Sequence, residues 1–499
     1  MKILLINTNR EHAPQPVVPM GLCLVASALE GQDFQVRLLD LCFSRQPLME
    51  TQRVLAEWKP DVIGLSIRNL DNGEYLQPRA YLPAITEIAH VCREKSSAKL
   101  IIGGPAVSIA PEQLLRLMQA DYAVVGEGEE VVVELMKAIA NGLTPASISG
   151  ICSANIGSNS SWEPARVEDF DSIAAAQPNK WLDLNRYLRW GSPLPLQSKR
   201  GCGLKCIHCT YRLIEGARYR LRSPEETVEE MKEAKARWGV RRFEFIDSTF
   251  NHPPAHARAL CETIIQKELR SELHTMALNP IGLSKELLEL MKRAGFTAIL
   301  CTLDSGSPKM LKIMRKGFDV DQIAKTAAWA REIGLGILWS FMFGAPGETE
   351  ETVRETLNFI EKTLGPRDRI LCTVGLRVYP RTELEEIACA EGAISSDADL
   401  LNPVFYCSPQ ISPARIVERI EGSRKRSHMI YLGALQQASL SHGLRLRAAL
   451  HLPGPAWANL PLYNLLARFN GGVAKSRCQL LRGRDGHAGG RYFLRLFFL

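Results

Sequence analysis

The chain has 499 residues, 46% of them hydrophobic and 23% charged, a composition ordinary for a globular protein of two or three domains. Only three of its 13 cysteines cluster, and the scattered remainder excludes a disulfide framework and predicts a reducing compartment, the cytoplasm. No apolar run reaches 18 residues, and the apolar stretch after Met1-Lys2 is too short for a signal peptide, so we predict neither a membrane span nor secretion.

Strand and helix signals alternate over residues 1–140, which is the pattern of a doubly wound parallel α/β sheet. Apolar runs predict strands at residues 2–7, 35–41, 61–67, 98–102 and 122–125. Helical spacing of apolar residues predicts intervening helices, which include residues 20–31, 80–94 and 112–120.

Ligands on such sheets bind beyond the carboxyl ends of the strands. Small or polar residues follow every predicted strand of this region, and small residues let the backbone approach a ligand. Any one of the glycines among them is only a turn signal, but the set predicts a binding site. Its members are Asn7, Asp40, Ser66, Arg68, Gly103, Gly104, Gly126 and Glu127.

Residues 141–195 are predicted to connect two domains, because their first part is rich in Gly, Ser, Asn and Ala, with a short strand at residues 150–154. A second series of strands and helices occupies residues 196–400. Its strands are predicted at residues 194–197, 243–247, 274–279, 298–303, 336–343 and 371–378, with helices that include 224–238 and 284–293. Six such units that close partly on themselves predict a partial barrel with its chemistry at the carboxyl-end mouth.

Three cysteines follow the first of these strands at the spacing C-x3-C-x2-C, at Cys202, Cys206 and Cys209. Three thiolates from one loop can hold three irons of a 4Fe–4S cluster and leave the fourth iron open to a small chelating molecule. Gly201 and Gly203 allow the loop to curl so that the sulfurs converge. The alternative is a zinc site, but zinc prefers four ligands and His208 is crowded beside Cys209.

Three later loops belong to the same mouth. Residues 303–307 read Leu-Asp-Ser-Gly-Ser, residues 343–349 read Phe-Gly-Ala-Pro-Gly-Glu-Thr, and residues 378–382 read Val-Tyr-Pro-Arg-Thr. Lys316-Gly317 follows the first of these loops, and we expect it to open the next helix. Each loop alone is an ordinary strand-to-helix turn, whereas their order and spacing behind the cysteines argue against coincidence.

The cysteine loop and these three turns resemble those of radical S-adenosylmethionine (SAM) enzymes. In that family SAM chelates the open iron and is cleaved to a 5'-deoxyadenosyl radical. The resemblance implies SAM contacts at His208, Asp304, Ser305, Gly344, Pro346 and Glu348. Residues 1–140 resemble the cobalamin-binding domain that precedes the barrel in one large class of these enzymes. This implies that the eight residues at the strand ends named above bind cobalamin.

The chain also departs from the family pattern. Many cobalamin proteins carry Asp-x-His-x-x-Gly after the second strand, with the histidine on cobalt, and here Cys42 replaces the histidine and Arg45 the glycine. A protein histidine below the cobalt is therefore not expected from this loop. Arg68 is a candidate to lie beneath the corrin, and the equally weighted alternative is an ordinary surface arginine. Asp304 replaces the family's glutamate and Arg381 a glycine.

The resemblance implies a cobalamin-dependent radical SAM methyltransferase that acts on an unactivated carbon or phosphorus centre. The alternatives are a cyclase or rearrangement enzyme that uses cobalamin without methyl transfer, and a SAM-only enzyme or regulatory protein with a degenerate N-terminal module. Expected partners are a small-molecule, lipid or peptide substrate and an electron donor such as flavodoxin or ferredoxin. The sequence carries no nucleic-acid-binding motif.

Residues 401–499 are predicted to form a mainly helical C-terminal region, with one helix over residues 411–435. From residue 440 onward nine Lys or Arg accompany one Asp, a local charge of +8, so the rest of the chain sums to −1 within the net charge of +7. A basic end with aromatic residues is compatible with peripheral contact to an anionic membrane or with a partner. A solvated cap or a disordered tail is the favoured alternative.

Overall fold

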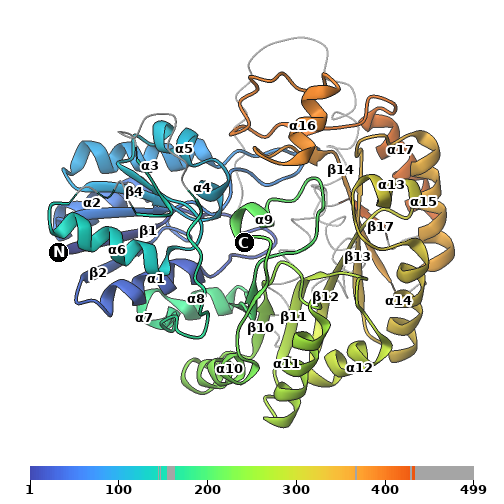
Figure 1. Cartoon of the computed structure of the whole chain (residues 1–499), viewed down its shortest axis with the longest axis horizontal. Coiled ribbons are helices and arrows are strands. Elements are labelled where there is room, and N and C mark those ends of the chain that lie inside the picture. Colours follow the sequence, from blue (N-terminus) through green and yellow to red (C-terminus); the bar gives the residue numbers. More distant parts are fainter. Residues whose placement is uncertain (144, 146–147, 154–162, 366–367, 427–429, 433–499) are drawn as a thin grey trace, which may run out of the picture.

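The computed structural model describes residues 1–143, 145, 148–153, 163–365, 368–426 and 430–432. Two sheets organise this part of the chain, one in each of two domains that lie side by side (Figure 1). The tail beyond residue 440, to which we assigned the membrane or partner contact, lies outside the described residues. No helix of the described residues is both long and apolar enough to cross a membrane.

The N-terminal sheet has the strand order β2-β1-β3-β4-β5-β6 and confirms the doubly wound prediction. Its members are β1 (Lys2–Asn7), β2 (Gln35–Asp40), β3 (Val62–Ser66), β4 (Lys99–Gly103), β5 (Tyr122–Val124) and the antiparallel β6 (Ile151–Ser153). The order reverses between β1 and β3, which is where such sheets bind ligands. Parallel register places Asp40, Asn7, Ser66 and Gly103 in one row at that edge.

Helices cover both faces of this sheet, because each strand carries apolar side chains on both sides. One face packs against α1 (Met20–Glu30) and α6 (Gly128–Ala140), which also contact each other. The other face packs against α2 (Pro47–Trp58), α3 (Leu82–Lys95), α4 (Pro105–Ile109) and α5 (Pro111–Leu117).

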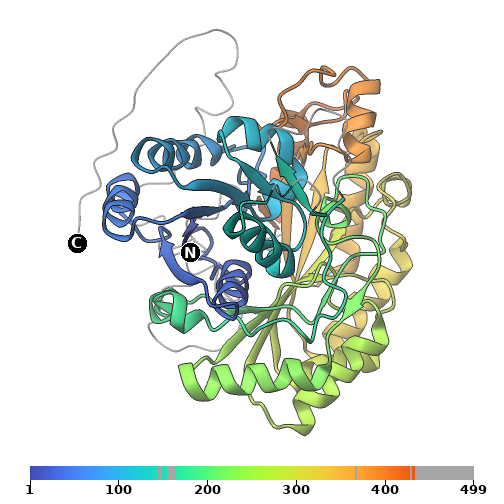
Figure 2. The same ribbon diagram turned by 60° about the vertical axis from the view of Figure 1, so that its left-hand side comes forward.

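The second sheet has the order β17-β14-β13-β12-β11-β10-β7 with every neighbouring pair parallel. A strand forms at each of the six predicted barrel positions, although the sixth ends earlier than predicted. They are β7 (Leu194–Leu196), β10 (Arg242–Phe245), β11 (Glu272–Leu278), β12 (Phe296–Asp304), β13 (Ile337–Phe343) and β14 (Arg369–Val374). Helices α10 (Pro224–Trp238), α11 (Pro254–Gln266), α12 (Lys285–Ala294), α14 (Val320–Ile333) and α15 (Glu350–Thr363) cover its outer side (Figure 1). The N-terminal domain faces the inner side, as the turned view also shows (Figure 2).

Three local predictions were wrong. The helix expected over residues 411–435 is shorter, because α17 spans only Pro413–Arg426. The strand β17 (Ile430–Leu432) follows it and pairs with the open edge of β14. The strand expected over residues 371–378 breaks at Gly375, whose φ of +76° turns the chain into a separate strand, β15 (Leu376–Arg377), paired with β16 (Phe405–Tyr406). Lys316-Gly317 does not open a helix, because α14 begins at Val320 behind a capping box at Asp319.

The segment between the domains is packed against both of them. Trp181 in α7 (Pro178–Trp181) donates its indole N–H to Ser27 of α1 at 3.0 Å. Tyr187 in α8 (Leu184–Arg189) donates its hydroxyl to Asp40 at 2.9 Å and is fully buried. Leu184 and Tyr187 also belong to the hydrophobic core of the barrel, so the connector contacts both domains.

Candidate active site

A cavity of about 860 Å³ lies between the two domains, a size ordinary for cofactor and ligand sites. The N-terminal domain contributes the carboxyl ends of β1, β3 and β4 and the loop after β5. The barrel contributes the three clustered cysteines and the inward-facing residues of β10 to β13. The two predicted sites, far apart in the sequence, therefore open onto one space.

The cysteine loop begins directly after a short strand, β8 (Lys199–Arg200), that pairs with β9 (Arg220–Leu221). Gly201 has a φ of +93°, and a Cβ there would lie 2.0 Å from the carbonyl oxygen of Arg218, so only glycine fits. The Cys202 amide donates to the carbonyl of Gly216 at 3.0 Å. These constraints curl the loop so that all three cysteines line the cavity.

The donor set fits an iron–sulfur cluster. Burial raises the pKa of Cys206 and that of Cys209, the latter to about 12, and the neighbouring cysteines raise both further. Three soft sulfurs on one loop are the donors that an iron–sulfur cluster takes, and its irons would favour the thiolate form that burial disfavours. Within the described ranges no three His, Cys, Asp or Glu side chains converge closely enough to hold a single metal ion.

A buried ion pair lies beside the cluster loop. Lys316 donates its Nζ to Oδ2 of Asp304 at 2.7 Å, and His208 Nε2 lies 3.8 Å from the same oxygen. Burial raises the pKa of Asp304, but Lys316 and His208 outweigh it, so the pKa is lowered and Asp304 is a carboxylate. All three side chains line the cavity, and the buried Nδ1 of His208 has no partner in the described residues. The sequence prediction missed Lys316 as a site residue.

The other predicted SAM contacts support the cavity wall from behind and do not line it. Glu348 is 1% exposed, and its carboxylate accepts the amide hydrogens of Gly344 and Ala345, which closes the turn around Pro346. Burial raises the pKa of Glu348 to about 7. Ser305 lies 3.0 Å, oxygen to oxygen, from Thr356 of α15 and so anchors the loop after β12 to that helix.

Seven of the eight predicted cobalamin contacts line the cavity, namely Asn7, Ser66, Arg68, Gly103, Gly104, Gly126 and Glu127. Asp40 is the exception, because it accepts hydrogen bonds from Tyr187, from Asn7 (2.8 Å) and from the Cys42 amide (3.1 Å). Gly104 has a φ of +106°, and a Cβ there would lie 2.7 Å from the carbonyl oxygen of Ile67. Backbone can therefore approach a large ligand along this wall.

One branch of the cavity enters the apolar layer between the N-terminal sheet and helices α1 and α6. Its lining includes Leu5, Gly64, Val25, Val132 and Met136. This branch extends the glycine-rich wall into a region suited to a flat apolar group. The sequence did not predict this branch, because each of these residues is of a type typical of a hydrophobic core.

The barrel side of the cavity leaves large apolar side chains uncovered. Tyr211, Ile246 and Met276 are 40%, 38% and 43% exposed, and all three line the cavity. Glu244 lies on β10, two residues before Ile246 and therefore on the same inward face of the strand. Burial raises the pKa of Glu244, and the nearby side chains of His274 and Arg68 only partly oppose this rise.

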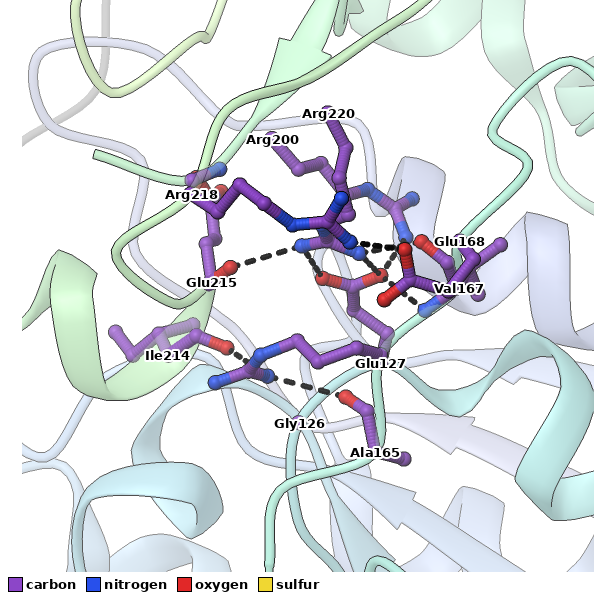
Figure 3. Close-up of polar contacts among 12 residues, drawn as sticks. Gly126, Glu127, Ala165, Val167, Glu168, Arg200, Ile214, Glu215, Arg218 and Arg220 are labelled. Atoms are coloured by element: carbon purple, nitrogen blue, oxygen red, sulfur yellow. Dashed lines mark hydrogen bonds and ion pairs between the residues drawn. The ribbon is translucent and has the colours of Figure 1, made fainter. Parts of the chain in front are cut away.

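Buried ion pairs join the loop after β5 to the start of the cysteine loop (Figure 3). Glu127 accepts from Arg200 at 3.1 Å, from Arg220 through both of its oxygens, and from the Val167 amide at 2.9 Å. Arg200 also donates to Glu129 at 2.7 Å. Burial raises the pKa of Glu127, but the two arginines outweigh it, and the pKa is lowered.

Family models match both halves of this arrangement. The B12 binding domain matches residues 6–136, and the radical SAM superfamily matches residues 196–360. The chain therefore belongs to the radical SAM enzymes that carry an N-terminal B12-binding domain, a class whose cofactors are a 4Fe–4S cluster, SAM and cobalamin.

The chain is also similar to individual proteins of known sequence or structure. An uncharacterized methyltransferase of Pyrococcus horikoshii is 27% identical over 405 residues, covering 79% of this chain and 84% of the relative. The tryptophan 2-C-methyltransferase of Streptomyces laurentii is 25% identical over 420 residues, covering 71% and 69%. The solved structure of the radical SAM methyltransferase TsrM from Kitasatospora setae, with tryptophan and a SAM analogue bound, superposes with a TM-score of 0.81 at 23% identity, covering 94% of this chain and 99% of that one.

Proposed function

We propose that the protein is a cobalamin-dependent radical SAM methyltransferase acting on an unactivated carbon or phosphorus centre of a small molecule. One observation carries the proposal: the three cysteines and the glycine-rich wall of the N-terminal domain line a single cavity. A corrin on one wall and a cluster on the other would then face the same substrate. The family relatives that are methyltransferases support the reaction type.

On the barrel side, Cys202, Cys206 and Cys209 would hold the cluster, with SAM on its open iron. Asp304 and His208 are the SAM contacts that line the cavity, and we add Lys316, which keeps Asp304 ionised. Ser305 and the turn over residues 344–348 would act by fixing the shape of the wall. When bound, cluster and SAM supply a carbon-centred radical and the corrin supplies the methyl group.

On the N-terminal side, Asn7, Ser66, Gly103, Gly104 and Gly126 would line the corrin site. The apolar branch toward α1 and α6 would take the nucleotide tail, and Asp40 would act indirectly through its hydrogen bond to Asn7. Of the two alternatives for Arg68, we choose the one beside the corrin, because Arg68 lines the cavity, and a cation there would not ligate cobalt. This assignment places cobalamin binding in residues 1–140, radical chemistry in 196–400, the connector in 141–195 and a cap in 401–499.

The substrate would lie between the two walls, against Ile246 and Met276. These uncovered apolar side chains favour a substrate with an apolar body, and the neighbouring carboxyl group of Glu244 favours one that also forms a hydrogen bond. Tryptophan, the substrate named for one relative, has both features. A flavodoxin or ferredoxin is the proposed electron donor, and lipid and peptide substrates are the alternatives.

Anaerobic purification with iron, sulfide and cobalamin, followed by an absorption spectrum, tests the cofactors. We expect absorption bands of both the cluster and the corrin in the wild-type protein. In an Arg68→Ala variant we expect the spectrum of cob(II)alamin to report an altered coordination of cobalt. Turnover with SAM and tryptophan or a fractionated metabolite extract is then read by product mass. A gain of one methylene supports methyl transfer; absence of corrin from the wild-type protein, or an oxidised product without added carbon, contradicts it.

A further inference from the structure

The charged cluster between the domains, which we call the interdomain ion network, consists of Glu127, Glu129, Arg200 and Arg220. Figure 3 labels Glu127, Arg200 and Arg220 of this network. The side chains of all four residues are at most 7% exposed. Both carboxylates follow β5 in the N-terminal domain, whereas both arginines belong to the β8–β9 pair that carries the cysteine loop. The network therefore joins the two halves of the active site directly.

Arg200 is the centre of this network. Its Nη1 donates to Glu127 at 3.1 Å, its Nη2 to Glu129 at 2.7 Å, and its Nε to Gln197 at 3.0 Å. Its guanidinium lies 4.4 Å from the centre of the Phe170 ring. Every edge and one face of the group are thus occupied, which fixes the backbone at a point two residues before Cys202.

On the N-terminal side, the backbone beside the two glutamates is constrained as well. Glu127 directly follows Gly126, which lines the proposed corrin site and has no room for a side chain, because a Cβ there would lie 2.4 Å from the carbonyl oxygen of Ala165. Glu129 lies in the first turn of α6, and its Oε2 is buried without a partner in the described residues. A second carboxylate is thus buried at some cost, which a role in packing alone does not explain.

The cluster loop is tied into the same network from within. Glu215 accepts the Gly201 amide at 3.1 Å and Gln197 Nε2 at 3.2 Å, and its carbonyl accepts from Arg220 at 2.8 Å. A movement of the loop after β5 would therefore shift Gly201 and Cys202 through only two residues, Arg200 and Arg220. Rigid, bidentate contacts transmit such a shift better than apolar packing, which tolerates sliding.

We propose that Arg200, held by Glu127 and Glu129, is a positioning residue that sets the separation between the cluster and the corrin. The inference rests on the proposed function, since it requires both cofactors to occupy the cavity. Arg200 also lines the cavity. In its positioning role it acts through the cysteine loop on one side and the loop after β5 on the other.

The test measures that separation in the loaded protein. When the reduced cluster and cob(II)alamin are both paramagnetic, their spin–spin interaction splits or broadens the electron paramagnetic resonance lines and depends steeply on distance. We expect a single, well-defined interaction in the wild-type protein. In Arg200→Lys, whose ammonium keeps the charge but does not reproduce the fork that holds two carboxylates, we expect a broadened distribution and at least a tenfold slower turnover. Iron and cobalt contents should stay within twofold of wild type.

Two further variants make the test decisive. Glu129→Gln removes one carboxylate charge and leaves Glu127, so we expect a smaller broadening of the same kind even if Arg200→Lys fails to fold. Arg218→Gln is the matched control, because Arg218 lies two residues before Arg220 and pairs with Glu168 of the connector, but both side chains are about 70% exposed. Its spectrum should equal that of wild type.

The outcomes are separable. An unchanged spin–spin interaction in Arg200→Lys and Glu129→Gln, or an equal change in Arg218→Gln, overturns the positioning role. A wild-type protein without bound corrin overturns the proposed function instead. Loss of cluster and corrin together in Arg200→Lys, with a wild-type spectrum in Glu129→Gln, reduces Arg200 to a folding role and also overturns the inference.

Discussion

The two domains are joined by two kinds of buried polar contact at opposite parts of their interface. Near the cysteine loop, the interdomain ion network shares two carboxylates between two arginines. Beyond β3, by contrast, Asp71 forms one closed pair with Arg377 of β15 at 2.6 Å, and their side chains are 0% and 4% exposed. The remaining hydrogens of Arg377 donate to backbone carbonyls, including that of Leu400 at 2.8 Å.

The difference teaches that burial of a salt bridge does not define its role. The hydrogen-bonding groups of Asp71 and Arg377 are occupied by each other and by backbone groups, so we assign this pair to holding the domains together. The ion network adjoins Cys202 and Gly126, so its buried ion pairs act on the geometry of the active site. The predictions below separate effects on chemistry from effects on stability.

The largest effect is expected from Cys206→Ala, which removes one cluster ligand and leaves both interdomain contacts intact. The cluster and reductive cleavage of SAM should be lost together, because two thiolates do not hold a cubane. Cobalamin binding by residues 1–140 should remain. Iron analysis and corrin absorption check this, and loss of the corrin as well would mean that the two sites do not load independently.

A large effect on stability, without one on geometry, is expected from Arg377→Met. It leaves the buried carboxylate of Asp71 unpaired, which costs about 3–5 kcal/mol. Thermal unfolding should show the loss, and the paired variant Asp71→Asn with Arg377→Met should recover part of it. The spin–spin interaction of the folded, loaded protein should match wild type, unlike that of Arg200→Lys.

An effect on pH dependence is expected from Lys316→Met. In the wild-type protein the pKa of Asp304 is lowered, so its contribution to stability is present above the unfolded pKa and is lost only in strong acid. Without Lys316, burial would raise that pKa, and stability would then fall as pH rises from about 4. Melting temperatures between pH 5 and 8 should decline more steeply than in wild type; parallel curves would contradict the assignment.

A smaller effect of the same kind is expected from Glu348→Gln. Burial raises the pKa of Glu348 to about 7, so ionising it in the folded protein costs free energy as pH rises from the unfolded pKa toward 7. The cost is at most about 1.4 kcal/mol for each pH unit in that window. The glutamine variant should show a flatter decline of melting temperature, and an unchanged slope would indicate that Glu348 is ionised throughout.

The smallest effect is expected from Arg218→Gln, which breaks the exposed pair with Glu168. Exposed pairs contribute about 0–1 kcal/mol, so melting temperature and corrin affinity should remain close to those of wild type. A loss comparable to that of Arg377→Met would show that position in the interface, and not burial, determines the strength of these contacts.

Much of the fold followed from local signals. Lys2–Asn7 and Pro224–Trp238 have the predicted bounds, because an apolar run and a capped, amphipathic segment are determined by neighbouring residues. The strand predicted from Leu371 to Val378 was wrong, because the chain breaks at Gly375. Tyr75, from the other domain, packs there, and its side chain would lie 2.9 Å from a Cβ at this position. The short strand β17 was not predicted, because it forms by pairing with the open edge of β14, which is distant in the sequence.

The candidate site divides in the same way. The spacing of Cys202, Cys206 and Cys209 and the order of the later turns identified the chemistry, since three ligands on one loop are a local property. The sequence did not distinguish Asp40, which is turned toward Tyr187, from Asn7, which lines the cavity, although both end neighbouring strands. It also missed Lys316, because nothing local marks a lysine that is buried against Asp304.

The sequence by itself determined the class of the protein, its order of strands and helices, and the cluster ligands. Only the tertiary structure brought Glu127 to Arg200 and Arg220, which are 73 and 93 residues away. It also turned Arg381, at a φ of +64° where the family has glycine, toward the carbonyls of Ser108 and Ile109. The physical reason is that local conformation depends on adjacent residues, whereas a buried charge is stable only where a distant partner completes its hydrogen bonds.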